Sequence, residues 1–472
     1  MLHRNLINGA MGVTAALLAY PLAELLEGRD VRSKVRALGR EMARPFAERR
    51  SASWAAVVDT VRHAAIEVPY YRDLFARIGF EPEKLMADAR YLHDIPYLTK
   101  DVIREQGDRL LRDDHISARK HVSKTGGSTG PAALIVYDQE AADWSSAVTR
   151  HVRGGIGKRH FHSELHFAAK FPDEFPLRDR LRERAKCLAM NRHNIFFASF
   201  EFAELEAMWR EIKLIQPHLV HGHPSTMYQL ALHVDAKPDH VRAFRIFESS
   251  GELLKGYQRD TISRVFQCDI VDRYGLAEVG IVAYQAGRRD PAMLVLDSMA
   301  WPEIAAAEGA DNLSLGGNGK AGELVVTATK NRMMPLIRYR TGDLAVLSQT
   351  ARGFELEELV GRIHDVVEIA GRKLPTHYIQ DVLDRIGGIK EFQIEIRQRR
   401  PVLRLVPDDG AKLDDIRARI GRYWQGAADV EFISSSELRL LGGRRKFRHL
   451  VAASTAPIAP NPLVATSLIP AK

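Results

Sequence analysis

The sequence predicts an α/β protein with a large N-terminal part built on a mostly parallel sheet and a small α+β part at the C-terminus. Short apolar, β-rich runs alternate with helical segments between residues 217 and 275. From about residue 310 short strands separated by turn residues take over, and a further mixed pattern begins near residue 361. The 472 residues, 45% of them hydrophobic, supply an ample core and exclude disorder as the main state.

The first residues carry the only stretch of the sequence that approaches a membrane span in length. Residues 5–23 are uncharged, but asparagine, glycine, threonine and proline dilute their apolar character. We expect an amphipathic helix packed on the body or lying on a membrane surface; a true span and a signal peptide are the alternatives. Apolar residues at three- and four-residue spacing then predict helices over 38–46 and 54–68.

The middle of the chain reads as parallel strands joined by helices. The predicted order is strand 217–222, helix 224–234, strand 245–251, helix 253–266 and strand 269–275. Three short strands, 322–329, 336–343 and 344–348, predict a small antiparallel region or barrel. The C-terminal unit is predicted as strand 366–371, helix 376–386, strands 393–398 and 402–407, and helix 412–425. The predicted parts are 1–54, 55–360, 361–453 and a tail, 454–472, that does not fold alone.

Composition excludes some functions. Cys187 and Cys268 lie far apart without metal-binding or redox spacing, which fits a reducing cytoplasm. Lys and Arg exceed Asp and Glu by 68 − 60 = 8, which by itself selects no partner. Without a recognised module or interleaved basic and aromatic residues, we expect no nucleic-acid binding. The sequence does not reveal the oligomeric state.

The strongest local signal is SKTGGSTG, residues 123–130. Its glycines let backbone N–H groups turn toward an anion, and its hydroxyls add donors, which favours a phosphate cradle. The GK[ST] ending of a P-loop is missing, and a flexible turn is the ordinary alternative. YGLAE (274–278), at the end of a predicted parallel strand, YRTGD (339–343) and GRIHD (361–365) follow, each most often a turn when it stands alone.

The order of these motifs carries a resemblance. TGGSTG, SSGE (249–252), YGLAE, YRTGD, GRxxD and a basic C-terminal segment resemble the adenylate-forming superfamily of acyl-CoA synthetases. PYYRDLF, IPYLTKDVIR and GHPSTMYQLA are similar to segments of its phenylacetate–CoA ligase and CapK-like branch. The resemblance covers residues 55 to 452. It implies a large multi-sheet adenylation domain with a small mobile α+β lid, and a cytoplasmic ligase that uses ATP, Mg²⁺ and CoA to activate a carboxylate as acyl-adenylate.

The resemblance also implies roles for individual residues. Thr125, Gly126, Gly127, Ser128, Thr129 and Gly130 match the phosphate loop; Ser250, Gly251 and Glu252 match the segment lining the adenine and acyl pocket. Tyr274, followed by Gly275, matches the adenine-stacking aromatic, Glu278 the Mg²⁺-associated carboxylate, Asp343 the ribose ligand and Arg362 its neighbour. His364 matches the pivot of the lid, and Lys446 the catalytic lysine.

The sequence departs from the family pattern in places. Pro131 comes one residue early after the phosphate loop, and Ala133 replaces a frequent lysine. Arg445 stands where a glycine usually precedes the lysine, and a shifted register would put Arg444 in its place. Arginine cannot fully replace a point-charge lysine, so a catalytically lapsed, nucleotide-binding scaffold at the membrane is one alternative. Transfer of the acyl group to an amine or hydroxyl acceptor, in surface polysaccharide or natural-product synthesis, is the other.

Two histidine groups need an interpretation. His160, His162 and His166 form one, and His218, His221 and His223 the other. Their spacing suits no common structural zinc site, so we do not predict a zinc centre. His221 and His223 lie at the carboxyl end of their predicted strand, and we expect them to flank the acyl pocket.

Overall fold

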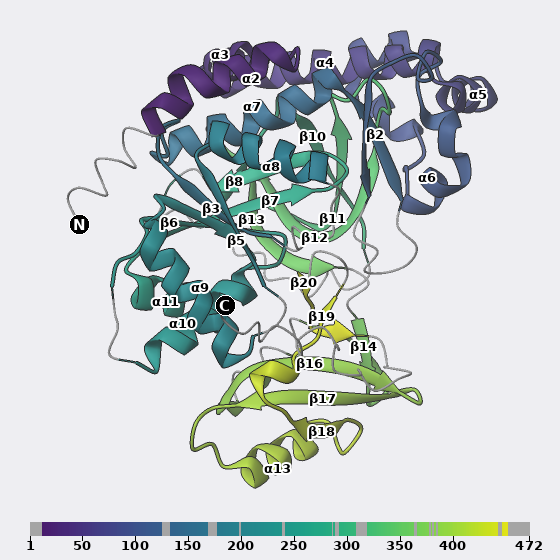
Figure 1. Cartoon of the computed structure of the whole chain (residues 1–472). Coiled ribbons are helices and arrows are strands. Elements are labelled where there is room, and N and C mark those ends of the chain that lie inside the picture. Colours follow the sequence, from purple (N-terminus) through teal and green to yellow (C-terminus); the bar gives the residue numbers. More distant parts are fainter. Residues whose placement is uncertain are drawn as a thin grey trace. The chain divides into compact units, whose positions relative to one another are not determined.

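A computed structural model of the chain has two compact units. The first comprises residues 1–365 and 440–447, and the second comprises 366–439 and 448–472 (Figure 1). The structure describes residues 12–124, 133–168, 177–197, 200–237, 241–285, 287, 292–307, 319–362, 366–376, 379, 382–383, 386–441 and 446–451.

One mixed sheet runs through the first unit. Its described strands are ordered β10-β11-β12-β13-β9-β8-β7-β6-β5-β3-β4. The parallel half contains β3 (Glu164–Ala168), β4 (Arg192–Phe196), β5 (Leu219–Gly222), β6 (Ile246–Ser250) and β7 (Asp269–Leu276). The antiparallel half contains β8 (Gly280–Gln285), β9 (Met293–Val295), β10 (Ala300–Ala305), β11 (Lys320–Ala328), β12 (Tyr339–Gln349) and β13 (Phe354–Arg362). A separate hairpin pairs β1 (Lys120–Lys124) with β2 (Leu134–Asp138).

Helices cover both faces of the parallel half. Successive side chains of each strand point to opposite faces of the sheet, so each strand contributes to two hydrophobic clusters, one under each layer of helices. Val220, Phe247 and Ile270 pack with α9 (Phe202–Ile215), α10 (Pro224–Asp235) and α11 (Gly256–Phe266). Their neighbours Leu219, Ile246 and Val271 pack with α3 (Val31–Met42) and α7 (Gln139–Gly155). Strands buried on both faces explain the continuous apolar runs of the sequence.

The N-terminal helices divide between the two halves of the sheet: α3 packs on the parallel half, and the helices from Phe46 onward pack on the antiparallel half (Figure 1). They are η1 (Ala15–Ala19), α2 (Tyr20–Leu26), α3, α4 (Phe46–Glu67), α5 (Pro69–Ile78), η2 (Pro82–Met86), η3 (Ala89–Asp94), α6 (Lys100–Gln106) and η4 (Gly107–Leu110); α8 (Leu177–Ala189) follows later. Within the described ranges, no helix is both long enough and apolar enough to span a bilayer.

The predicted elements between 217 and 275 are confirmed within a few residues, as is the α/β class, but three details are wrong. No single helix covers 38–46, because α3 ends at Met42 and Pro45 precedes α4. Residues 339–343 of one predicted strand and 344–348 of the next belong to a single strand, β12, which passes through Gly342 at φ +76°. The strands β11, β12 and β13 extend the main sheet, which is therefore mixed.

The second unit has its own sheet and core. Its strands β16 (Ile389–Arg397), β17 (Arg400–Pro407), β18 (Asp429–Phe432) and β21 (Leu450–Val451) have the order β18-β17-β16-β21. A hairpin joins β14 (Val366–Ile369) to β15 (Arg372–Pro375), and α13 spans Leu413–Tyr423. The predicted helix 376–386 lies partly outside the described residues; its described positions Ile379, Val382 and Leu383 are buried in this core. The predicted tail lies outside them.

Candidate active site

Two of the sequence motifs hold each other together. The Tyr274 hydroxyl of YGLAE donates to Asp343 Oδ2 of YRTGD over 2.8 Å. The Tyr339 hydroxyl of YRTGD donates to Glu278 Oε1 of YGLAE over 2.8 Å. Each motif therefore supplies a tyrosine that orients the carboxylate of the other. All four side chains are buried, although the two bonds join residues 69 and 61 positions apart.

The backbone explains how these residues meet. Tyr274 and Gly275 lie at the end of β7, where its pairing with β8 shifts register. A Cβ on Gly275 would lie 3.0 Å from the Gly280 carbonyl oxygen, so the tight β7–β8 connection that carries Glu278 favours glycine there. Asp343 lies on β12 opposite Arg362 of β13, whose side chain is outside the described part of the structure. Pairing of β12 with β13 joins YRTGD to GRIHD, and the two tyrosine–carboxylate bonds bring YGLAE to them although β7 is not their neighbour in the sheet.

Glu278 has a second partner that sequence reasoning missed. Lys100 Nζ, at the start of α6, lies 3.4 Å from Glu278 Oε1. The sequence motifs assign no site role to Tyr339 either. Lys100 lies in IPYLTKDVIR and Tyr339 lies in YRTGD, but only the fold shows that these two residues contact Glu278. A carboxylate with an ammonium and a hydroxyl donor on one oxygen is firmly oriented.

The SSGE segment begins in the last two residues of β6 and continues past the carboxyl end of that strand. Gly251 has φ +88°, a conformation that disfavours other residues. Glu252 Oε2 accepts the Ser225 N–H over 3.3 Å at the first turn of α10, where backbone donors lack helical partners. His223 Nδ1 lies 2.8 Å from the Ser250 carbonyl oxygen and therefore donates, since a carbonyl only accepts. These bonds place Ser250, Glu252 and His223 together.

The segment with the predicted lysine also lies beside Glu252. Leu440–Leu441 (β19) pairs with Lys446–Phe447 (β20), and the Phe447 N–H donates to Glu252 Oε1 over 2.6 Å within the first unit. This places the backbone of Lys446 one residue from Glu252; its side chain is not described. Thr125–Gly130 and His364 lie outside the described residues. The described strands β1 and β2 flank the first of these segments.

His221 belongs to a buried network of ion pairs that is centred on Arg153, Glu164 and Glu248. Arg153 binds Glu248 through two nitrogens, with NH2–Oε2 2.6 Å apart, and its NH1 lies 2.9 Å from Glu164 Oε2. His221 Nδ1 lies 2.8 Å from Glu248 Oε2, and His166 Nε2 lies 3.2 Å from Glu164 Oε1. Further contacts to the two glutamates come from Lys158, Arg192, Arg273 and Tyr284.

The pKa shifts in this network follow from burial and charge. Burial opposes ionisation of both glutamates, yet Arg153 holds the pKa of Glu164 and of Glu248 well below the usual range. Burial lowers the pKa of His221 to about 4, with Glu248 opposing the shift and nearby arginines adding to it. A neutral His221 is thus built into the end of β5.

In the described part of the chain, no three His, Cys, Asp or Glu side chains are placed to hold a metal ion. His162 stacks on His218 at 3.7 Å between ring centroids, and His160 Nδ1 contacts Arg150. These contacts account for three of the histidines by packing and hydrogen bonding.

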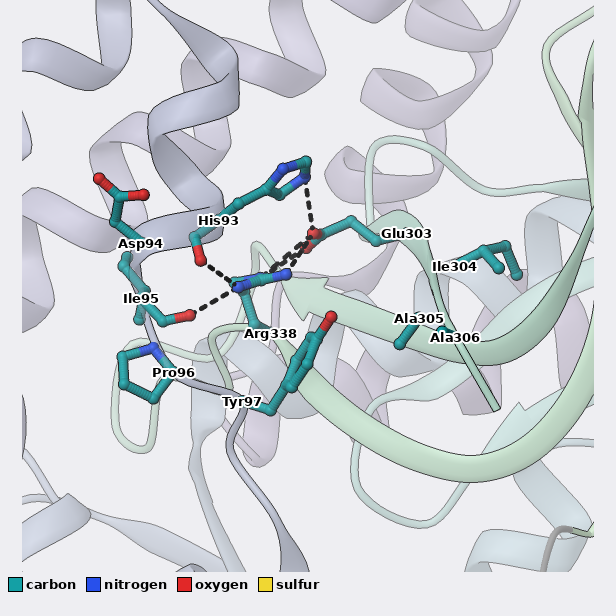
Figure 2. A pocket seen from close by; sticks show the side chains of 10 residues that line it. All are labelled: His93, Asp94, Ile95, Pro96, Tyr97, Glu303, Ile304, Ala305, Ala306 and Arg338. Carbon is teal, nitrogen blue, oxygen red and sulfur yellow. Dashed lines mark hydrogen bonds and ion pairs between the residues drawn. The ribbon is translucent and has the colours of Figure 1, made fainter. Parts of the chain in front are cut away.

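A cavity of about 410 Å³ lies between residues 93–97 and β10 (Figure 2). Arg338, at φ +50°, donates to Glu303 and to the carbonyl oxygens of His93 and Ile95. Its guanidinium lies 4.3 Å from the Tyr97 ring centroid. Burial raises the pKa of Glu303, and Arg338 opposes the rise. None of the predicted site residues lines this cavity, and the contacts of Arg338 fasten the N-terminal segment to the sheet.

Three comparisons place these observations among known proteins. No family model matches the chain. It is 25% identical over 343 residues to the phenylacetate-coenzyme A ligase of Pseudomonas putida, covering 71% of this chain and 75% of the relative. It is 25% identical over 356 residues to the same enzyme of Escherichia coli K12, covering 72% and 77%.

The fold has solved counterparts. A 2-hydroxyisobutyryl-CoA ligase, in the postadenylation state with 2-HIB-AMP, matches with a TM-score of 0.68 and 20% identity over 88% of this chain and 92% of that one. The same ligase in an open conformation with 2-HIB-AMP and CoA gives a TM-score of 0.58 and 20% identity over 88% and 93%. At this identity the match concerns the fold.

Proposed function

We propose that this chain, a relative of the phenylacetate–CoA ligases with the fold of an acyl-CoA ligase, is an AMP-forming acid–thiol ligase. A carboxylate oxygen attacks the α-phosphate of ATP and releases pyrophosphate; the CoA thiol then attacks the acyl-adenylate and releases AMP. The observation that carries the proposal is the reciprocal pair of tyrosine–carboxylate bonds between YGLAE and YRTGD. It joins the two motifs that the resemblance assigns to adenine, ribose and Mg²⁺.

The nucleotide is proposed to lie at the ends of β6, β7 and β12. Tyr274 supplies an aromatic face for adenine, and the oxygens of Asp343 accept from the ribose hydroxyls. Ser250, Gly251 and Glu252 line the pocket, and Arg362, opposite Asp343 on β13, completes the ribose end. Thr125–Gly130 is proposed as the phosphate loop, with backbone N–H groups that bind the β- and γ-phosphates.

Glu278 is the proposed Mg²⁺ ligand. Its donor set fits the ion, because Mg²⁺ is commonly bound by one or two carboxylates together with substrate phosphate oxygens and water. Lys100 and Tyr339 fix the carboxylate through one oxygen. A bound Mg²⁺ would neutralise phosphate charge, while the chain's own residues hold the carboxylate in place.

Lys446 is the proposed catalytic lysine. Its strand hydrogen-bonds to Glu252, two residues past the end of β6, which brings the backbone of Lys446 beside the proposed pocket. An ammonium there would bridge the substrate carboxylate and the α-phosphate as negative charge builds. We also propose that the predicted C-terminal part, residues 361–453, acts as a lid that pivots at His364 between the two half-reactions; in this structure its segments 361–365 and 440–447 group with the first unit.

The acyl end of the site is proposed to lie beyond His223 and His221, at the carboxyl ends of β5 and β6. His223 is held by the Ser250 carbonyl, so the histidine is fixed next to the pocket segment. The relatives name phenylacetate as their acid, which makes arylacetates the first acids to test for this chain. We propose a cytoplasmic location from the cysteine pattern, with surface association through residues 5–23, of which residues 5–11 lie outside the described part of the structure.

The test is ATP–pyrophosphate exchange with Mg²⁺ across aromatic, aliphatic and amino acids, followed by detection of the CoA thioester. Lys446→Ala should lower exchange at least about hundredfold, whereas Lys412→Ala, another exposed lysine, should leave it unchanged. Exchange without a thioester would favour an amine or hydroxyl acceptor. Silence with ATP still bound would favour the lapsed scaffold. Exchange that survives Lys446→Ala would overturn only the lysine assignment.

A further inference from the structure

The first described helical stretch, η1–α2, is packed with its apolar side outward. Leu17, Leu18, Leu22, Leu25 and Leu26 are exposed, the last two by 76% each. The inward residues include Glu24, which is 5% exposed and accepts the Val31 and Arg32 N–H groups over 2.6 and 2.8 Å. Packing against the rest of the chain does not explain a helix that buries its glutamate and exposes its leucines to solvent.

This stretch is fixed in place rather than loosely attached. A Cβ on Gly12 would lie well inside contact distance of the Phe161 carbonyl oxygen, so the helix approaches the body closely there. The Arg150 guanidinium lies 3.3 Å from the Tyr20 ring centroid. Glu24 meanwhile receives the first N–H groups of α3, which have no helical partners. The outward leucines are therefore presented by an anchored element.

The neighbouring helix α8 also exposes a row of leucines to solvent. It packs against η1 and α2, and Arg182 lies 3.7 Å from Glu27 at the end of α2. Leu177, Leu181 and Leu188 are 68, 54 and 65% exposed and follow one another at four and seven residues, which puts them on one face. We call these three residues and the five leucines of η1–α2 the leucine surface.

Basic residues border the α8 leucines. Arg178 precedes Leu181 by three residues and Arg184 follows it by three, so both lie beside the leucine row. The helix holds five basic residues, Arg178, Arg180, Arg182, Arg184 and Lys186, against two acidic ones, Asp179 and Glu183. Arginines flanking an exposed leucine row match the headgroups and acyl boundary of an anionic bilayer.

We propose that the leucine surface docks this protein on an anionic lipid bilayer, with the leucines in the acyl boundary and the α8 arginines at the phosphates. The inference does not depend on the proposed function. Charge complementarity favours an anionic bilayer over a second copy of this chain as the binding partner. In a two-fold dimer formed around α8, the basic helix of one copy would face the same basic helix of the other. Helices that lie in the interface plane need no membrane span.

Sedimentation with vesicles tests the proposal. The full chain should bind vesicles of phosphatidylcholine and phosphatidylglycerol, bind phosphatidylcholine vesicles much less, and be released by salt. Leu25→Gln/Leu26→Gln, Leu181→Gln/Leu188→Gln and Arg178→Glu/Arg184→Glu should each lower partitioning by about tenfold or more. Leu214→Gln and Arg210→Glu, exposed positions on α9, are matched controls that should change nothing.

Folding is checked by thermal melting, and activity in solution by pyrophosphate exchange; both should match wild type for every variant. Failure of wild type to bind anionic vesicles would overturn the proposal. Binding that persists in the three double variants, or falls equally in the α9 controls, would also overturn it. Sedimentation equilibrium showing a dimer that the leucine variants dissociate, without vesicle binding, would identify a second copy as the occupant instead.

Discussion

Two sets of buried carboxylates in the first unit are held in opposite ways. In the parallel half, Glu164 and Glu248 are surrounded by cationic partners led by the shared Arg153. At the junction with the antiparallel half, Glu278 and Asp343 are oriented by the hydroxyls of Tyr339 and Tyr274, with Lys100 as an added cation at Glu278. The first set is a closed ionic core, whereas the contacts described for the second set come from two hydroxyl groups and one ammonium group.

The difference separates structural from chemical roles. A carboxylate neutralised by several guanidinium groups has no electrostatic reason to exchange partners for a nucleotide or a metal ion. A carboxylate oriented by a neutral hydroxyl keeps its negative charge and can accept from a ribose or coordinate Mg²⁺. The comparison therefore predicts that mutations in the first set damage stability, whereas mutations in the second damage activity.

The largest effect is expected from Arg153→Met. Removing the shared guanidinium takes away the positive charge that pairs with the buried carboxylates of Glu164 and Glu248. We therefore expect a loss of about 3–5 kcal/mol in the free energy of unfolding. Urea unfolding followed by tryptophan fluorescence measures it. Arg178→Met, an exposed arginine, should cost less than about 0.5 kcal/mol. A similar small loss for Arg153→Met would show that the network is not a structural core.

Glu278→Gln should lower activity and leave stability almost unchanged. It keeps the shape of the side chain but removes its charge, so pyrophosphate exchange should fall by about 10²–10³-fold, while unfolding changes by about 1 kcal/mol or less. Raising Mg²⁺ should restore part of the rate if the carboxylate binds the ion. A stability loss as large as that of Arg153→Met, with the rate unchanged in the folded fraction, would place Glu278 with the structural set.

A smaller effect concerns pH. The folded pKa of His221, about 4, lies below the ordinary value of 6.5. The unfolded chain then binds the extra proton first, so this group's contribution to stability is present above about pH 6.5 and is lost as pH falls toward 4. We expect up to about 3 kcal/mol over this range.

The expected result is read as the difference between wild type and His221→Gln in urea unfolding at several pH values. Asp272 acts in the opposite sense, because burial raises its pKa to about 6, but this contribution is common to both proteins. Parallel stability curves for the two proteins between pH 4 and 7 would contradict the shift at His221.

The smallest effect is expected from Tyr274→Phe, which keeps the ring and deletes the hydrogen bond to Asp343. The KM for ATP should rise about 5- to 10-fold, in line with one lost hydrogen bond to a charged group. Tyr284→Phe is the matched control, since it deletes a hydroxyl donor to Glu248 in the other set. An equal rise in KM in both variants would erase the distinction between the two sets.

The sequence itself determined the elements whose signals are local. Apolar runs, helical periodicity and Pro224 were enough to predict β5, α10, β6, α11 and β7, because each depends on neighbours within a few residues. Motif order was likewise enough for the resemblance to acyl-CoA synthetases, and for choosing Tyr274, Glu278 and Asp343.

Only the tertiary structure decided which partners those residues have. Packing placed Tyr274 against Asp343 and Tyr339 against Glu278, although β7 and β12 are not neighbouring strands, and it brought Lys100 from the N-terminal helices to Glu278. Packing also paired His221, at the carboxyl end of β5, with Glu248. The physical reason is that register and packing depend on contacts between distant segments, which no local pattern encodes.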